Sequence, residues 1–418
     1  MRLSDLSREA GFLRRDRGAL FWLALALVLS VLSVAFGLAE VRDQRATIAV
    51  LKVEDAADRA DAIARQSDWG GAAYHAFHLT YDPPSALAFA ALGQRDNAAW
   101  KHRIRMLALE GQIYEADTQN PDFALVGRFD FAFVAAYLAP LLLILLLYDM
   151  RSGERAAGRH DLLVTTAGQA RRLWLPRALL RYIALSGCIL LPLIVGAMIE
   201  TVPIGAVAMA CLVVIGSLFI WWLAVELISR IGASTSVLLT FMIGLWLTLC
   251  VVVPALAKNV IEARYPVPDG GEIMMLQREA VNDAWDLPKE ATMEPFLAQY
   301  PEWRERGSIA RPFEWKWYYA FQQVGDQQAE PLVRQYRDGR IARDRAAGTA
   351  SLLSPASFVE RRLEHLAYTD VSAVLSYEAA IRDFHARLRQ FHYQLLFRDP
   401  PYNPESLDQL PEFKPAGP

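Results

Sequence analysis

Residues 131–148 read FAFVAAYLAPLLLILLLY and contain no charged side chain. A helix of about 18 to 24 residues, rising roughly 1.5 Å per residue, can cross a hydrocarbon core of about 30 Å. Further uncharged runs of this length are residues 19–39, 182–199, 204–225 and 234–257. We therefore expect an all-α polytopic membrane protein with about five transmembrane helices.

Charged residues lie beside these runs and not inside them. They are Asp130, Asp149, Arg181, Glu200 and Glu226. Ion-coupled carriers and proton pumps usually need an ionisable group near the middle of the membrane. Its absence from the runs indicates that the energy for any transport comes from outside this chain.

Arginines are concentrated in residues 1–18 and 149–181, whereas the connection at 200–203 has no basic residue. The positive-inside rule places both arginine-rich segments in the cytoplasm. Residues 40–128 and 258–418 are then extracytoplasmic, and the odd number of crossings leaves the C-terminus on that side. We interpret the first run as a retained helix, because it is longer than the apolar part of a signal peptide and no clear cleavage site follows it.

The cysteines fit a bacterial cytoplasmic (inner) membrane with a periplasmic or extracellular domain. Cys188, Cys211 and Cys250 all lie in apolar runs, so neither extracytoplasmic segment can form a disulfide, which a periplasm permits but does not require. The net charge of −3 comes from well-mixed charges. Nucleic-acid binding therefore has no support in the sequence.

Both extracytoplasmic segments have helical patterns, and together they predict one mostly helical domain with a shared core. A charged stretch at 53–66 is expected to continue the first transmembrane helix. In the second segment, apolar residues recur near every 3.6 positions, at Val374, Tyr377, Ile381, Phe384, Leu388 and Phe391. Proline and glycine divide residues 271–397 into several predicted helices, and a proline-rich tail follows at 400–418. The dividing residues are Pro288, Pro295, Pro301, Gly307, Gly325, Pro331, Gly339, Gly348 and Pro355.

Aromatic residues gather in the second extracytoplasmic segment. They are Trp303, Phe313, Trp315, Trp317, Tyr318 and Tyr319. We interpret them as a helix-packing core of the domain. The alternatives are a belt at the membrane surface, where amphipathic rings are favoured, and a wall that grips an amphiphilic substrate.

The first cytoplasmic segment, residues 1–18, has an amphipathic pattern. Its apolar face consists of Leu3, Leu6, Ala10 and Leu13, and charged residues occupy the other faces. This pattern is typical of a helix that lies along the surface of the lipid bilayer. The alternative is a frayed basic tail that only sets the topology.

The second cytoplasmic segment, residues 149–181, predicts a rigid elbow at the membrane surface. A charged helix leaves the second membrane run, and an apolar group at 162–164, a Thr/Ala/Gly turn and a basic restart follow. Such an elbow can fit a groove on a soluble partner and transmit the partner's movement to two membrane helices.

This elbow resembles the loop after the second transmembrane helix in permease subunits of ABC type-2 transporters. An acidic residue, a glycine, a leucine pair and a basic pair match that loop, at Glu154, Gly158, Leu162, Leu163, Arg171 and Arg172. The chain is similar in particular to a subgroup with large extracytoplasmic loops, related to the maturation permease of nitrous oxide reductase. The outer loop of that subgroup carries a Leu-Ser-Pro turn and a Leu-Ala-x-Thr-Asp ending. The matching residues here are Ser354 and Pro355 in the turn, and Thr369 and Asp370 in the ending.

The resemblance implies a non-catalytic permease subunit that pairs with a second copy or a sibling permease and with cytoplasmic ABC ATPase subunits. ATP and Mg would bind to those ATPases, since this chain has no Gly-x-x-x-x-Gly-Lys-Ser/Thr motif for nucleotide phosphates. We expect no cofactor in this chain, and an uncharged membrane core favours an amphiphilic cargo. The family usually has a sixth transmembrane helix after the outer domain, whereas no apolar run follows Phe397 here.

Other candidate sites have weaker patterns. His75 and His78 can bring two imidazoles together on one helix, at a spacing that suits Zn or Cu, but no third ligand accompanies them. His385 and His392 are two helical turns apart, which indicates helix packing. No Ser/His/Asp or Cys/His set can be placed, so we do not expect an enzyme.

A second class of function remains open at this stage. The chain can be a membrane-anchored scaffold whose outer helical domain engages a periplasmic partner without translocation. A related alternative is a mechanotransmission subunit, in which an ABC machine moves the outer domain and carries nothing across the membrane.

Overall fold

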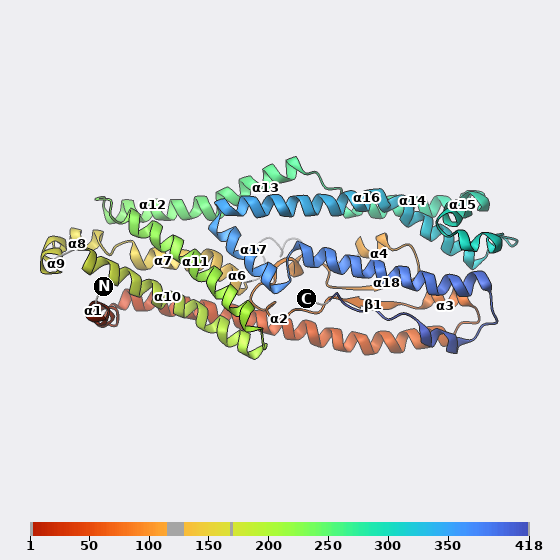
Figure 1. Cartoon of the computed structure of the whole chain (residues 1–418), viewed down its shortest axis with the longest axis horizontal. Coiled ribbons are helices and arrows are strands. Elements are labelled where there is room, and N and C mark those ends of the chain that lie inside the picture. The colour runs from red at the N-terminus through yellow and green to blue at the C-terminus, as the bar shows by residue number, and fades with distance from the viewer. Residues whose placement is uncertain (1–2, 115–128, 168–169, 417–418) are drawn as a thin grey trace.

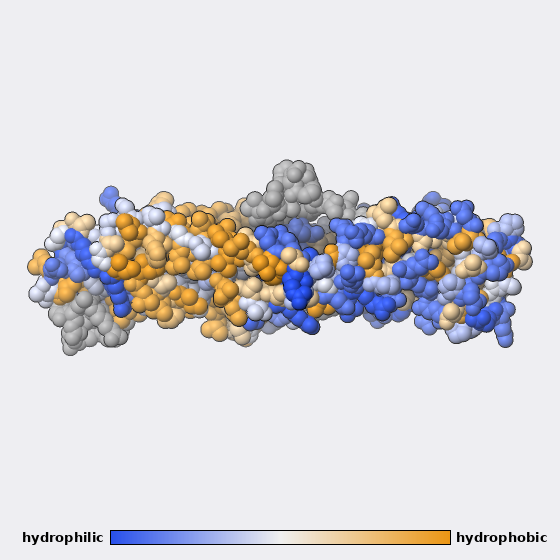
Figure 2. Space-filling model, turned by 90° about the horizontal axis from the view of Figure 1, so that it is seen from above, coloured by the Kyte–Doolittle hydropathy of each residue, from blue (hydrophilic) through white to orange (hydrophobic). Residues whose placement is uncertain are grey.

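The molecule is long and narrow (Figure 1), and it has an apolar half and a polar half along its length (Figure 2). The computed structural model describes residues 3–114, 129–167 and 170–416. We call the apolar half the membrane bundle and the other half the polar domain. On the face that Figure 2 shows, the surface of the bundle is mostly apolar and that of the polar domain is mostly hydrophilic.

The bundle contains five helical segments that are long and apolar enough to cross a membrane, as predicted. Within the described residues, these segments consist of α2 (Arg17–Ala64); α6 (Phe131–Phe133), η2 (Val134–Leu138) and α7 (Ala139–Leu147); α10 (Ala170–Ile199); α11 (Ile204–Ile228); and α12 (Thr235–Leu247), η3 (Thr248–Val252) and α13 (Val253–Arg264). The chain is therefore a helical membrane protein.

Helix α2 connects the two halves. It is 48 residues long, and its N-cap Asp16 accepts a hydrogen bond from the backbone N–H of Ala19. The charged continuation predicted at 53–66 is helical through Ala64 and runs along the polar domain. A single rigid element therefore joins the far end of the bundle to the polar domain.

Two of the membrane segments contain a π-helical turn just before a proline. The turn η2 precedes Pro140, and η3 precedes Pro254. Proline has no N–H and its ring crowds the carbonyl one turn earlier, so the helix widens locally to accommodate it. Both wide turns contact α17 (Pro355–Ala367) of the polar domain.

Short helices cover the end of the bundle opposite the polar domain. They are α1 (Leu3–Leu13), α8 (Ser152–Ala156) and α9 (His160–Ala167). Helix α1 packs against α10, and two ion pairs fasten this region: Glu9 to Arg177 over 2.8 Å and Asp16 to Arg181 over 2.7 Å.

The polar domain is built from both long segments, and it is mostly helical, as predicted. The first segment contributes α3 (Trp69–His75), β1 (His78–Tyr81), η1 (Gly93–Asp96), β2 (Lys101–Ile104) and α4 (Glu110–Tyr114). The second contributes α14 (Gly270–Asp286), α15 (Lys289–Gln299), η4 (Pro301–Arg306), α16 (Trp315–Ala350), η5 (Ser351–Leu353), α17, α18 (Val371–Arg398) and η6 (Pro404–Gln409).

A small antiparallel sheet departs from the helical expectation for the first segment. Strands β1 and β2 pair with His78 opposite Ile104 and Tyr81 opposite Lys101. Alternate residues of β1 are buried against α18, as in the pair of rings His78 and Phe384, 5.8 Å apart. This contact with a helix distant in sequence stabilises a hairpin that would be marginal alone.

The expected division at every proline and glycine was wrong within α16. Gly325, Pro331, Gly339 and Gly348 all lie inside this single 36-residue helix, and Pro295 lies inside α15. Gly325 and Gly339 allow neighbours to approach closely: a Cβ would lie 2.8 Å from Val281 at the first and 2.7 Å from Val267 at the second. Packing against the residues before and within α14 therefore outweighs the local preference for breaks.

Aromatic rings fill the core of the polar domain. Trp303, Trp317 and Tyr319 are buried, whereas Phe313 is exposed. The predicted apolar face of α18 is buried at Tyr377, Ile381, Phe384 and Leu388, and His385 and His392 are buried on the same helix. The core interpretation of the aromatic cluster is therefore confirmed for its buried members.

Candidate functional site

A buried loop closes the bundle where it meets the polar domain. Residues 87–92 have no regular helix or strand, yet all six are at most 3% exposed. The carbonyl of Ala90 accepts from the N–H of Ala132, and that of Ala91 accepts from Thr369 Oγ1. These bonds satisfy backbone groups that burial would otherwise leave unpaired. We call residues 87–92 the plug segment.

Two glycines of the membrane helices make room for the plug segment. A Cβ on Gly37 in α2 would lie 1.9 Å from the Phe89 carbonyl oxygen, and one on Gly196 in α10 would lie 2.6 Å from the Phe89 ring. Only glycine permits such an approach. Sequence reasoning missed this segment, although it is a short uncharged run that follows Pro83 and Pro84 within a polar block.

Helix α17 enters the bundle beside the plug segment. Its buried residues Ala356, Val359, Leu363 and Ala367 belong to the hydrophobic core of the membrane helices. The helix contacts α11 and both π-helical turns. Part of the polar domain therefore forms a wall among the membrane helices.

The two motifs singled out in the second segment cap this helix. Ser354 is the N-cap of α17 and accepts from the N–H of Ser357, and Pro355 is its first residue. At the other end, Thr369 bonds to the plug segment, and Asp370 is the N-cap of α18 and accepts from the N–H of Ala373. Ser354, Pro355, Thr369 and Asp370 thus fix where α17 begins and ends.

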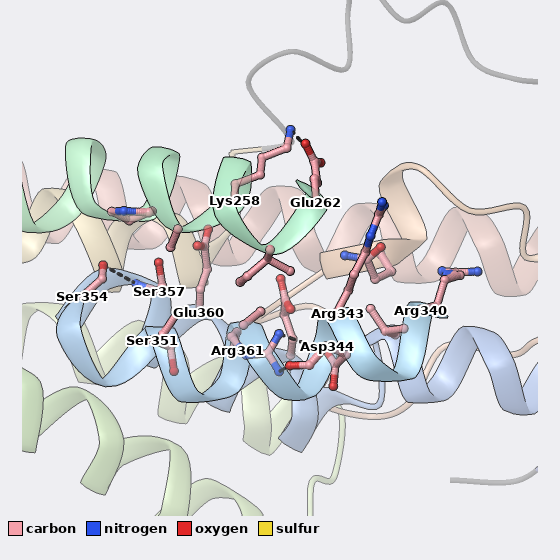
Figure 3. Close-up of a pocket in the computed structure, with 18 of the residues that line it drawn as sticks. Lys258, Glu262, Arg340, Arg343, Asp344, Ser351, Ser354, Ser357, Glu360 and Arg361 are labelled. Atoms are coloured by element: carbon pink, nitrogen blue, oxygen red, sulfur yellow. Dashed lines mark hydrogen bonds and ion pairs between the residues drawn. The ribbon is translucent and has the colours of Figure 1, made fainter. Parts of the chain in front are cut away.

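A cavity of about 590 Å³ lies between α13, α16 and α17. Its apolar lining includes Pro254, Ala257 and Ile261 of the last membrane segment. Figure 3 shows Glu360 pointing into the space between the helices, while Lys258 and Glu262 point away from it. Drug-sized ligands occupy cavities of about 300 to 1,000 Å³.

Carboxylates of α17 face the membrane segments at this cavity. The hydroxyl of Tyr137, in the turn η2, donates to Glu360 Oε2 over 2.9 Å. Glu364 lies one turn further along and lines the same cavity. Desolvation raises the pKa of Glu360 to about 7, and desolvation together with the charges of Glu360 and Asp130 raises the pKa of Glu364 to about 8.

Asp130 stands at the start of the neighbouring membrane segment. It caps α6 by accepting from the N–H of Phe133, and its other oxygen accepts from the N–H of Leu92 at the end of the plug segment. Burial raises the pKa of Asp130 to about 6, although these two hydrogen bonds act to lower it. Three carboxyl groups with raised pKa values therefore meet at the junction.

Most of the cations around the cavity already have partners. Arg361 forms an ion pair with Asp344 over 2.9 Å, and Arg340 forms one with Glu378 over 3.2 Å. Arg343 donates to the carbonyl of Tyr265, at the C-terminal end of α13, over 2.7 Å. Within the described residues, Glu364 has no ion pair or hydrogen bond through its side chain.

A second cavity of about 570 Å³ lies deeper in the polar domain. It shares Gln94, Arg340 and Arg343 with the first and reaches His102 and Tyr114. The two cavities therefore lead from the membrane segments toward the interior of the polar domain.

The predicted elbow lies at the opposite end of the molecule, where α8 and α9 follow the second membrane segment. Glu154 pairs with Arg159 over 2.8 Å around Gly158, whose φ of +67° requires a glycine-like backbone. A buried ion pair between Arg151 and Glu226 holds the start of the elbow to the end of α11.

The leucine pair of the elbow is divided between two environments. Leu162 is 70% exposed, whereas Leu163 packs against the core of the bundle. Both are in helix α9. Arg171 and Arg172 lie in the first turn of α10, and their side chains are outside the described part of the chain.

The N-terminal helix shares a cavity with the elbow. Leu6, Ala10 and Leu13 of α1 are half-buried, and the side chain of Leu3 is not described. A cavity of about 400 Å³ separates α1 from α9 and is lined by Leu13, Leu163 and arginines of both segments. The apolar face of α1 was expected to lie along the surface of the bilayer. In the structure, part of this face packs against the bundle and the elbow.

The histidines proposed as weak metal candidates do not share a helix. His75 ends α3, whereas His78 begins β1 and is buried against α18. The turn between them prevents the helical spacing that was expected. Within the described residues, no group of three or more His, Cys, Asp or Glu side chains is arranged to hold a metal ion.

Comparisons with known proteins gave a family match to part of the chain. Residues 271–416 match a family described as a domain of unknown function (DUF3526). This range runs from α14 to the tail, so it includes the α16 and α17 walls of the cavity but not the five membrane segments. No match was found among the curated proteins or among the solved structures.

Proposed function

We propose that the chain is the permease subunit of an ABC type-2 transporter, driven by a separate cytoplasmic ATPase. The elbow and α1 would then face the cytoplasm of a bacterial inner membrane, and the polar domain would face outward. A second copy or a sibling permease would complete the transport unit. The cargo would leave through the junction with the polar domain.

The observation that carries this proposal is the exposed Leu162 on an elbow that is otherwise anchored. Leu163 and the ion pair of Arg151 with Glu226 fix the elbow to the bundle, and the Glu154–Arg159 pair braces the elbow internally. Leu162 extends into solvent. An exposed apolar side chain on a rigid support suits insertion into a pocket of a partner. A push on this side chain would reach α7 and α10, which flank the elbow.

The far end of the bundle supports the same proposal. The plug segment and α17 both come from the polar domain, and both are packed among membrane helices. Movement of these helices must therefore move the plug segment or α17. In a permease, this arrangement would couple events at the elbow to opening at the junction.

The test is the double substitution Leu162→Glu with Leu163→Glu, together with Leu162→Glu alone. In a tagged full-length protein purified from its host in mild detergent, both variants should lose a co-purifying P-loop ATPase. Val53→Glu is the matched control, because Val53 is 71% exposed on α2 and far from the elbow. Unchanged ATPase recovery with Leu162→Glu would refute the coupling role.

The mechanotransmission alternative is favoured by α2, which spans both halves as one helix of 48 residues. Such a helix can move the polar domain without opening a path through the bundle. Reconstitution with the ATPase separates the two functions: cargo movement across liposomes supports the permease, and ATP-dependent change in the polar domain without cargo movement supports mechanotransmission.

A further inference from the structure

The cavity at the junction is lined on one side by apolar groups of the last membrane segment. Pro254 and Ala257 lie at the end of an apolar run, and Ile261 follows one turn later on α13. Ala347 and Ala350 at the end of α16 face the same space. This lining would accommodate the apolar part of a ligand and offers it no hydrogen bond.

Most charged side chains that line the cavity have ion-pair partners within the described residues, but two acidic side chains of α17 do not. Lys258 and Glu262 lie 3.9 Å apart and point away from the space, and Arg361 pairs with Asp344. Arg343 is bonded to the carbonyl end of α13, where the helix dipole is negative. Among the described residues that line this cavity, Glu360 and Glu364 are therefore the acidic side chains without an ion pair.

We propose that this cavity binds an amphiphilic organic cation, with its positive charge against Glu360 and Glu364 and its apolar part along Pro254, Ala257 and Ile261. The cavity volume of about 590 Å³ suits a ligand of drug size. The proposal names the chemical class of the cargo, and it rests on the proposed function only where it treats the bound cation as transported.

The position of the two carboxylates explains why a cation is selected over an anion. Glu360 is held toward the membrane segments by the hydroxyl of Tyr137, and Glu364 is next to it on α17. An anion placed there would meet both carboxyl groups, while Arg340 and Arg361 are held in ion pairs and Arg343 donates to the carbonyl of Tyr265. A neutral ligand would lack the attraction to the two carboxylates that a cation gains.

The test uses two probes that have nearly the same size and shape but opposite charge, tetraphenylphosphonium and tetraphenylborate. Equilibrium binding of radiolabelled tetraphenylphosphonium to the full-length protein in dodecyl maltoside, at pH 8, should saturate at one per chain. Tetraphenylborate should bind at least about tenfold more weakly. Equal binding of the two ions would overturn the proposal.

Substitutions locate the site. Glu364→Gln, and Glu360→Gln with Glu364→Gln, should each weaken tetraphenylphosphonium binding by about tenfold or more. Glutamine at 360 can still accept the hydrogen bond from Tyr137, and Glu364 has no described partner to lose, so these variants should fold. Glu330→Gln is the control, because Glu330 is an exposed residue of α16 that does not line the cavity. Full-strength binding by Glu364→Gln and by the double variant would overturn the proposal.

Two further measurements are needed. The first identifies whether the bound cation comes from the bilayer or from solution, and the second distinguishes the cation site from the proposed transporter function. Added lysyl-phosphatidylglycerol, a lipid with a net positive charge, would identify a cationic lipid of the bilayer as the source if it competes with the probe. Competition only by a soluble lipophilic amine would identify that amine class as the source. ATPase activity of the complex is measured with the same probe. If the probe binds but no ATPase partner is found, the cation site is supported and the proposed transporter function is refuted. If an ATPase is coupled but the probe does not bind, the transporter function is supported and the cation site is refuted.

Discussion

The hydroxyl of Tyr137 donates to Glu360 Oε2 over 2.9 Å, and this bond joins a π-helical turn of the membrane bundle to a helix of the polar domain. The two residues are 223 positions apart in the chain. A second hydrogen bond joins the same turn to α12, because Nε1–H of Trp246 donates to the Tyr137 carbonyl over 3.1 Å. The junction is therefore held by specific hydrogen bonds as well as by apolar packing.

Removal of this bond should loosen the junction. Tyr137→Phe keeps the ring and leaves the Glu360 carboxyl group without its donor, at a cost of about 0.5 to 1.5 kcal/mol. We expect a lower midpoint of thermal unfolding in detergent. Tyr368→Phe is the control, since Tyr368 is 55% exposed, and an equal shift in both variants would mean that the bond contributes nothing specific.

Binding of tetraphenylphosphonium should strengthen as pH rises from 6 to 9. The pKa of Glu360 is raised to about 7 and that of Glu364 to about 8, so both carboxyl groups are mainly neutral at pH 6 and mainly ionised at pH 9. The groups that act on them are Asp130, Asp370, Arg361 and the hydroxyl of Tyr137. Titration of binding at fixed probe concentration measures this effect, and a flat profile in the wild type would contradict it.

Gly37→Ala should displace the plug segment. The added methyl would lie 1.9 Å from the backbone oxygen of Phe89, and buried backbone cannot yield as a flexible side chain can. We expect destabilisation of about 3 kcal/mol, seen as a thermal midpoint lower by several degrees. Gly187→Ala is the matched control on α10, because nothing lies within 4 Å of a Cβ there; a loss in that variant of the same size would contradict the steric explanation.

The polar domain should lose stability in acid because of its buried histidines. Desolvation lowers the pKa of His392 to about 4 and that of His102 to about 4, and burial also lowers the pKa values of His78 and His385. Between the unfolded value near 6.5 and a folded value of about 4, the unfolded chain binds more protons. Stability is therefore fully present above pH 6.5 and falls as pH decreases toward 4.

His392→Leu should reduce this dependence. Neither ring nitrogen of His392 has a hydrogen-bond partner in the described part of the chain, so an apolar side chain of similar size loses no bond. As pH falls from 6.5 to 4, the free energy of unfolding of the variant should decrease less than that of the wild type, by up to about 3 kcal/mol. Thermal unfolding followed by circular dichroism at several pH values measures it. An unchanged pH dependence in His392→Leu would contradict this explanation.

The membrane segments could be predicted from the sequence because each depends on its own residues. A run such as 204–225 is apolar all round, and backbone groups in lipid must be satisfied within the segment, so length and composition are enough. The same holds for the apolar face of α18, where Tyr377, Ile381, Phe384 and Leu388 recur at the helical spacing. Local periodicity decided these elements.

The hairpin, the long helix α16 and the plug segment could not be predicted in this way. His78 is in a strand because of α18, Gly339 is helical because Val267 packs on it, and residues 87–92 are buried because Gly37 and Gly196 give them space. Each outcome depends on a partner far along the chain. Reasoning from local propensity has no access to such contacts.

The sequence by itself determined that the protein has about five membrane-crossing helices. It also determined that charged residues lie at the ends of these helices, and which segments connect them. Only the tertiary structure decided that α17 and the plug segment enter the bundle, that Leu162 is exposed while Leu163 is packed, and that Glu360 and Glu364 line one cavity with Pro254. The physical reason is that hydrophobic insertion is a property of each segment alone, whereas a cavity and its charge are made by residues that meet only when the chain has folded.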